Sequence, residues 1–178
     1  MIPTHKQKRC GRRLLKLFVY GTLKKGCPNH DVYCNTAVSA EQAAVRGRLY
    51  EHPFGFPILQ VPQREILAVG TIDPLADAIT QASHEKEFAA SWHERVMAAS
   101  QQAEWPLIRG ELLTFDDPES CLPVIDELED YYPEQISVYS RVLLPVLTGM
   151  NSLVPAWAYV SGISTRGLKL IDKDHWSC

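Results

Sequence analysis

A short apolar segment near the N-terminus constrains the fold more than any other stretch of this chain. Residues 14–20 are apolar except for Lys16, and the run ends at Gly21-Thr22. A run of this kind predicts a strand buried on both faces. The glycine allows a tight turn or a close approach to a ligand. Backbone N–H groups in such a turn can bind a carboxylate or an oxyanion; the alternative is an ordinary strand and turn without a ligand.

The rest of the chain predicts more strands than helices. Strand patterns occur at 45–50, 58–61, 66–72, 107–115, 138–147 and 154–162. Residues 31–44 could hold a short helix, and Asp73-Pro74 is typical of the start of a helix that continues to about residue 102. Another helix start at Asp116 is followed by Pro123, which predicts a turn and then a short helix from about 123 to 130. Short strands with few helices indicate an α+β fold or a partly closed barrel.

Length and charge limit the classes of function. The 178 residues fit one domain, which we expect to span residues 14–178, after a disordered basic tail at 1–13. The net charge of −3 argues against nucleic acid as a partner, because nucleic-acid-binding proteins usually carry a large basic surface. No apolar run approaches the roughly 18–20 residues that span a bilayer, so we expect no membrane association.

The five cysteines, at positions 10, 27, 34, 121 and 178, have no paired spacing. An odd, unpaired set predicts free thiols in a reducing compartment, and therefore a cytoplasmic location. Cys27, His30 and Cys34 could supply three zinc ligands, but no fourth ligand follows at a recognisable spacing. The sequence therefore predicts no metal site.

Four carboxylates lie within residues 126–130, at the expected C-terminal end of a helix. Most such runs are solvated helix ends. If one of the carboxyl groups points inward, burial and like-charged neighbours would raise its pKa toward neutrality, as an acid–base catalyst requires. The chain contains neither a G-x-S-x-G nucleophile motif nor a phosphate-binding glycine loop. The best candidate site therefore combines the Gly-Thr turn with a carboxyl group.

The segment Phe18-Val-Tyr-Gly-Thr-Leu23, with Pro28-Asn-His30 after it, resembles a signature of the gamma-glutamylcyclotransferase family. The gamma-glutamylamine cyclotransferase branch and its small bacterial relatives are the most similar. Further matches follow in the same order: Gly47-Arg-Leu-Tyr50, Gly110-Glu-Leu-Leu, Ile125-Asp-Glu-Leu-Glu129, Tyr139-Ser-Arg141 and Ala156-Trp-Ala-Tyr159. The resemblance covers residues 16–72 and 107–176, and it leaves about 73–105 as a helical insertion.

The resemblance implies a small mixed β-barrel-like sheet with a few short helices. It also implies a transferase or lyase that closes a γ-glutamyl amine or amide into 5-oxoproline and releases an amine, without a cofactor. Glu129 matches the family's catalytic acid. A non-catalytic protein that binds a small metabolite on the same fold is the alternative. The motifs specify neither the leaving amine nor the oligomeric state.

The remaining site residues also follow from the resemblance. The backbone N–H groups of Gly21, Thr22 and Leu23 would bind the oxyanion or the substrate's α-carboxylate, and Tyr20, Tyr139 and Tyr159 would line the pocket. The family often has glycine where this chain has Asp130, and this additional acid is expected to raise the pKa of Glu129.

Overall fold

Strand β1 (Leu15–Val19) lies between β6 (Leu107–Phe115) and β8 (Leu153–Ser161) in the computed structural model of the chain. It pairs antiparallel with β6 and parallel with β8. The structure describes residues 13–100, 104–150 and 152–178, without the side chains of 89–100. Leu17 faces one hydrophobic cluster and Phe18 the other, and both are almost fully buried. The prediction of a strand buried on both faces is therefore confirmed.

The main sheet closes into a barrel. Its strand order is β2-β6-β1-β8-β7-β5, and β2 (Ser39–Arg46) also pairs with β7 (Tyr139–Thr148). Ala43 lies opposite Thr148 across this closing pair, while the short strand β5 (Ala68–Val69) extends the sheet beside β7. The α+β class with a barrel-like sheet is thus confirmed. Closure gives each barrel strand a partner on both sides and so removes the sheet edge at that point.

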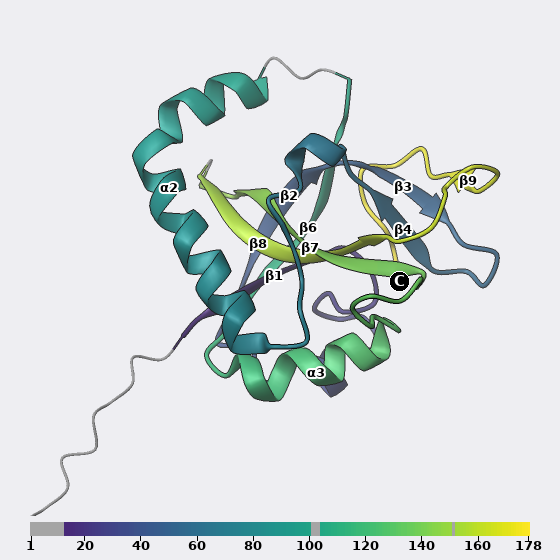
Figure 1. Cartoon of the computed structure of the whole chain (residues 1–178). Helices are drawn as coiled ribbons and strands as arrows, with labels where there is room; N and C mark the ends of the chain where they lie inside the picture. The colour runs from purple at the N-terminus through teal and green to yellow at the C-terminus, as the bar shows by residue number, and fades with distance from the viewer. Residues whose placement is uncertain (1–12, 101–103, 151) are drawn as a thin grey trace, which may run out of the picture.

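A smaller sheet lies at one end of the barrel (Figure 1). It consists of β3 (Arg48–Glu51), β4 (Pro57–Gln60) and β9 (Lys169–Leu170). Gly47 separates β2 from β3, and a Cβ there would lie 2.6 Å from Cδ1 of Leu59. Only glycine allows the chain to pass this closely as it leaves one sheet for the other.

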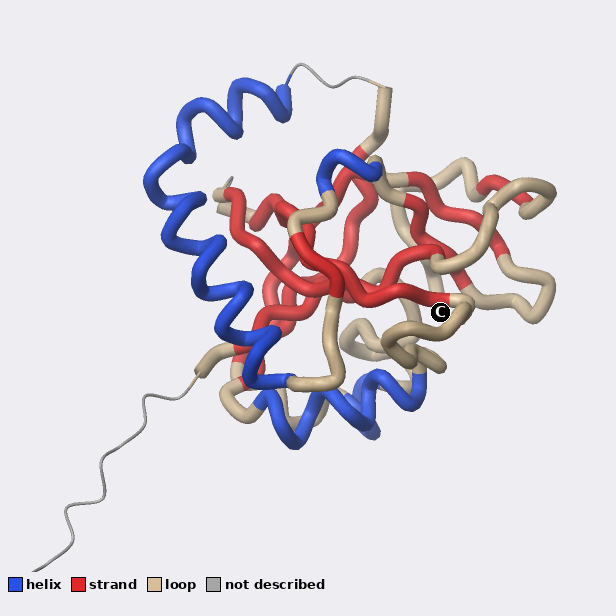
Figure 2. The backbone as a smooth tube through the Cα atoms, viewed as in Figure 1, coloured by secondary structure: helices blue, strands red, loops and turns tan. Residues whose placement is uncertain are grey.

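The helices cover the outer face of the barrel strands. Helix α2 (Pro74–Ser100) runs along one flank, and α3 (Pro118–Leu128) crosses one end (Figures 1 and 2). Ala78 of α2 and Leu122 of α3 join the same buried cluster as Leu17. The short helix α1 (His30–Tyr33) and a 3-10 turn (Gln63–Glu65) complete the helical part. Within the described residues, no helix combines the length and apolarity that a membrane crossing requires.

The expectation of a short helix within 31–44 is met only at the start of that segment, and the expectation for Pro123 is wrong. Helix α1 ends at Tyr33, and the second half of the segment contributes to β2. Pro123 does not divide the downstream helix, because α3 is continuous from Pro118 to Leu128. Pro123 is exposed, whereas the neighbouring Leu122 is fully buried, so the proline leaves the packing face of the helix intact.

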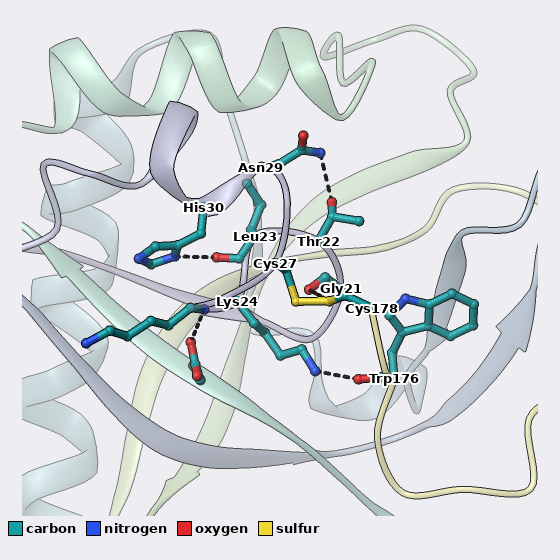
Figure 3. The surroundings of a disulfide bond; sticks show 11 residues. Gly21, Thr22, Leu23, Lys24, Cys27, Asn29, His30, Trp176 and Cys178 are labelled. Atoms are coloured by element: carbon teal, nitrogen blue, oxygen red, sulfur yellow. Dashed lines mark hydrogen bonds between the residues drawn. A yellow bond between two sulfur atoms is a disulfide. The ribbon is translucent and has the colours of Figure 1, made fainter.

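A disulfide joins Cys27 to Cys178, 151 positions apart (Figure 3). The expectation that all cysteines are free thiols is wrong for this pair, and the argument from free thiols to a reducing compartment no longer holds. Cys34 and Cys121 are free and buried. The Lys24 ammonium also donates to the Trp176 carbonyl, at 2.5 Å. The C-terminal segment is thereby attached to the loop that follows β1.

Removing this cross-link should destabilise the protein, because the unfolded chain regains the conformational freedom that the disulfide withholds. We expect C178S to lower the free energy of unfolding by about 2–4 kcal/mol, measured by urea denaturation. A reductant should have a similar effect on the wild-type protein and no further effect on C178S. Equal stability of oxidised wild type and C178S would contradict this role.

Candidate active site

A cavity of about 400 Å³ opens where β1 ends. Its walls come from the turn after β1, the C-terminal end of α3, strands β7 and β8, and the segment that leads into β4. All the residues that the sequence singled out for the site border this one cavity: Tyr20, Gly21, Thr22, Leu23, Glu129, Tyr139 and Tyr159. The structure therefore brings the Gly-Thr turn and the acidic run together, although they lie far apart in the sequence.

Side chains of the loop that follows the turn hold Gly21–Leu23 in place. Asn29 Nδ2 donates to Thr22 Oγ1 at 2.9 Å, and the imidazole Nδ1 of His30 donates to the Leu23 carbonyl at 2.8 Å (Figure 3). Across the described part of the chain, the amide N–H groups of Gly21, Thr22 and Leu23 donate no recorded hydrogen bond. Because these amides lie at the cavity, they are available to an anionic group of a ligand.

Gly21 is needed for the closeness of the turn to the opposite wall. A Cβ at this position would lie 3.2 Å from Cγ of Pro57, at the start of β4. A larger side chain would push these two walls apart or fill the space between them. The glycine in the signature thus serves close packing at the cavity, and its backbone angles are not of the left-handed kind.

Glu129 follows the last residue of α3 and caps that helix. Its carboxylate accepts no hydrogen bond that the structure records among the described residues, so it is free to act on a ligand. Burial, and secondarily the negative charge of Asp126, raise the pKa of Glu129 to about 7. A carboxyl group with this pKa exchanges protons near neutral pH.

The expectation that Asp130 raises the pKa of Glu129 is wrong. The charged neighbour that does so is Asp126, one helical turn earlier. Asp130 lies beyond the end of α3, is exposed, and has φ of 51°. This left-handed conformation favours glycine and is tolerated by aspartate.

The three tyrosines border the cavity, but their hydroxyl groups bind the protein. The hydroxyl of Tyr20 donates to the Tyr159 carbonyl at 2.9 Å, and that of Tyr139 donates to the Pro57 carbonyl at 2.6 Å. The Tyr159 hydroxyl donates to Asp126 Oδ1 at 2.7 Å. Burial raises the pKa of all three phenols. The three tyrosines are therefore neutral residues of the cavity wall, and their hydroxyl groups link the elements that form this wall.

Several cavity residues were missed by sequence reasoning about the site. Phe56 belongs to the aromatic turn before β4; its ring stacks on His52 with centroids 4.2 Å apart and approaches Tyr139 at 6.1 Å. Asn29 lies beside Pro28 in the loop that follows the signature. Asn29 could have been found because it lies close to the signature in the sequence. Phe56 could not, because it lies at the cavity only when β4 has paired with β3.

The residues weighed as zinc ligands have other partners. Cys27 is in the disulfide, His30 is bonded to the Leu23 carbonyl, and Cys34 is a buried thiol whose pKa burial raises to about 12. In the portion of the chain that the structure describes, no three metal-ligating side chains form a group that could hold an ion. The cavity instead presents backbone N–H donors and the Glu129 carboxyl group, for which no partner is recorded among the described residues.

Comparisons with known proteins agree with this architecture. The family model described as "Gamma-glutamyl cyclotransferase, AIG2-like" matches residues 17–95 and 78–178. An AIG2-like protein from Mus musculus has a TM-score of 0.55 at 18% identity, over 93% of this chain and 89% of that one. YkqA from Bacillus subtilis has a TM-score of 0.52 at 20% identity, over 92% of this chain and 39% of that one. No match is found among curated proteins. At these identities, the two structures share the fold with this chain.

The raised pKa of Glu129 predicts a pH-dependent cost to stability. Because the folded state holds the proton more tightly than the unfolded chain, stability from this group falls as the pH rises from about 4.5 to about 7. We expect E129Q to be more stable than the wild type at pH 8, by roughly 3 kcal/mol, with the difference vanishing below pH 4.5. Urea denaturation across this pH range measures the effect.

E127Q is the matched control for this measurement. It removes the carboxylate of an exposed neighbour on the same helix, and we expect no stability gain that grows with pH. A pH-independent difference between E129Q and the wild type would contradict the burial of the Glu129 carboxyl group.

Proposed function

Since the chain belongs to the AIG2-like gamma-glutamyl cyclotransferase family, we propose that it is an enzyme that releases 5-oxoproline and an amine from a γ-glutamyl amine or amide. One observation supports this proposal most strongly. The same cavity is bordered by backbone N–H groups without a partner and by a carboxyl group without a partner. These are the two kinds of group that an intramolecular acyl transfer uses.

The proposed reaction balances within the substrate. Its α-amino nitrogen attacks the γ-carbonyl carbon, the bond between these atoms forms, and the bond to the leaving nitrogen breaks. The attacking ammonium nitrogen gives up two protons as it becomes the lactam N–H: one is released to solvent, and the other is returned to the leaving nitrogen, which departs as the amine. Because both reacting groups belong to one molecule, correct orientation supplies much of the rate. The step requires no nucleophile from the protein and no oxidant or reductant.

Glu129 is the proposed carrier of that proton. To serve first as a base and then as an acid, a carboxyl group needs a pKa near the working pH. The pKa of about 7 supports this role, as does the lack of any recorded hydrogen bond to its carboxylate within the described residues. The carboxyl group of Asp126, one helical turn earlier, is bound to Arg141 and Tyr159.

Gly21, Thr22 and Leu23 are the proposed anion-binding half of the site. Their amides would bind the α-carboxylate of the substrate or the oxyanion that develops on the γ-carbonyl oxygen. Tyr20, Tyr139 and Tyr159 are proposed to enclose the glutamyl carbon chain. A cavity of about 400 Å³ lies within the range of small-molecule sites.

The activity is tested by incubating the purified protein with γ-glutamyl-ε-lysine and a panel of other γ-glutamyl amines, and measuring 5-oxoproline. We expect E129Q to lower kcat by about 10²–10⁴-fold, the usual contribution of acid–base catalysis, and E127Q to retain activity. Because Glu129 must be ionised to accept a proton, kcat/KM should fall with decreasing pH below about 7.

Two outcomes would contradict the proposal at different points. Product formation that persists in E129Q would remove the role of Glu129 while leaving the activity. No turnover across the panel, together with thermal stabilisation by a γ-glutamyl compound, would favour a binding protein that retains the fold and cavity without catalysis.

A further inference from the structure

Behind the Glu129 wall of the cavity lies a buried ionic cluster centred on Arg141 of β7. Its side chain has no exposure to solvent. One guanidinium nitrogen, Nη1, donates to both carboxylate oxygens of Asp126 on α3, at 2.9 and 2.7 Å. The other, Nη2, donates to Oδ2 of Asp77 on α2 at 2.5 Å and to the Thr71 carbonyl at 2.6 Å. A single cation therefore binds carboxylates from both helices.

The surroundings of Arg141 leave the guanidinium little freedom to move. A Cβ on Gly70 would lie 2.6 Å from its Nε, so the backbone passes directly against the group. The ring of Tyr131 lies 5.1 Å from it, and the Tyr131 hydroxyl donates to the Gly70 carbonyl at 2.7 Å. Asp77 accepts two further hydrogen bonds from Thr71, through its amide and its hydroxyl. The position of Asp126 is thus imposed by a fully packed group.

Asp126 connects this cluster to the cavity in two ways. It accepts the hydroxyl of Tyr159, whose ring borders the cavity. It also lies one helical turn before Glu129, where side chains share one face of a helix. Burial raises the pKa of Asp126 to about 6, and the donors from Arg141 and Tyr159 limit that rise, so that the carboxylate is ionised at pH 7. The Glu129 carboxylate has no such recorded donor.

Asp130 also borders the cavity, but it is exposed and is not among the causes that raise the pKa of Glu129. The other titratable groups that face Glu129 in the described part of the chain are neutral near pH 7. They are Tyr20, at the end of β1, Cys34, after α1, Tyr139 of β7 and Tyr159 of β8. Burial raises the pKa of each of these groups. Asp126 is therefore the charged group that acts on Glu129.

We propose that Asp126 is a positioning residue for Glu129: held ionised by Arg141 and Tyr159, it leaves Glu129 as the carboxyl group of the pair that takes up and releases the proton. This inference rests on the proposed function. Asp77 of α2 binds the far side of the same guanidinium, and it does not border the cavity. The proton passes between Glu129 and the substrate, and Asp126 gives up none.

The test compares D126N with D126E and D77N. D126N removes the charge next to Glu129, D126E keeps a carboxylate there, and D77N removes a charge from the far side of Arg141. Titration of the Glu129 carboxyl group by ¹³C NMR, with the signal assigned through its loss in E129Q, requires no turnover. The pH profile of kcat/KM on a γ-glutamyl amine is the second readout.

We expect D126N to lower the pKa of Glu129 by about one unit, since a like charge is lost. The acid limb of the kcat/KM profile should move to lower pH by the same amount. D126E should restore both values toward those of the wild type. D77N should lower stability while leaving both values unchanged. A uniform loss of rate in D126N, with an unmoved Glu129 titration, would overturn the inference in favour of a purely structural role.

Two further outcomes are decisive. If the wild-type protein turns over no substrate but D126N shifts the Glu129 titration, the proposed function fails and the influence of Asp126 on Glu129 stands. If D126N does not fold, the wild-type titration decides. An ionised Asp126 beside Glu129 predicts a Glu129 pKa above that of free glutamate, and a Glu129 titration at the ordinary glutamate value would overturn the inference.

Discussion

The ion pairs of Arg141 are the interaction on which the arrangement of barrel, helices and cavity depends. A buried ion pair contributes little net stability compared with apolar side chains of similar volume, but loss of one partner leaves a buried charge without compensation. The position of Arg141 on β7 is set by the barrel, and its donors fix Asp77 on α2 and Asp126 on α3. Because α3 ends beside the cavity, fixing Asp126 also fixes the position of Glu129 at the end of that helix. The ionic cluster thus determines geometry more than it determines stability.

The candidate site follows from the closure of the sheet. β1 and β8 are parallel neighbours, so Tyr20 at the end of one strand and Tyr159 near the end of the other reach the same end of the barrel. Helix α3 packs its apolar face on these strands through Leu122 and Ile125. Glu129, directly after its last turn, therefore lies at the same end of the barrel as Tyr20 and Tyr159. The turn after β1 then lies across the cavity from the carboxyl group. Each half of the site is local in sequence, and the barrel brings the halves together.

Much of this site was predictable from particular residues. The run from Leu14 to Tyr20 and the Gly21-Thr22 break indicated a buried strand with an exposed turn, and the ordered motifs indicated Glu129. The neighbour that raises the pKa of Glu129 was misassigned to Asp130. Helical spacing contained the correct signal, because Asp126 is three residues away on the same face, whereas Asp130 leaves the helix with a positive φ. The fixed positions of the tyrosine hydroxyls were not predictable, because their acceptors are backbone carbonyls of distant strands.

Apolar periodicity, turn residues and motif order were enough to determine the α+β class, the buried first strand and the two segments that form the cavity, since these depend on local patterns. Tertiary structure alone decided three things. It joined Cys27 to Cys178, because a pairing between remote cysteines leaves no trace in their spacing. It placed β2 at Ser39–Arg46, within a segment for which the sequence allowed a helix. It also gave α2, which the sequence marked as a separate insertion, a buried aspartate on Arg141. The groups that bind Arg141 come from elements that meet only once the barrel has closed.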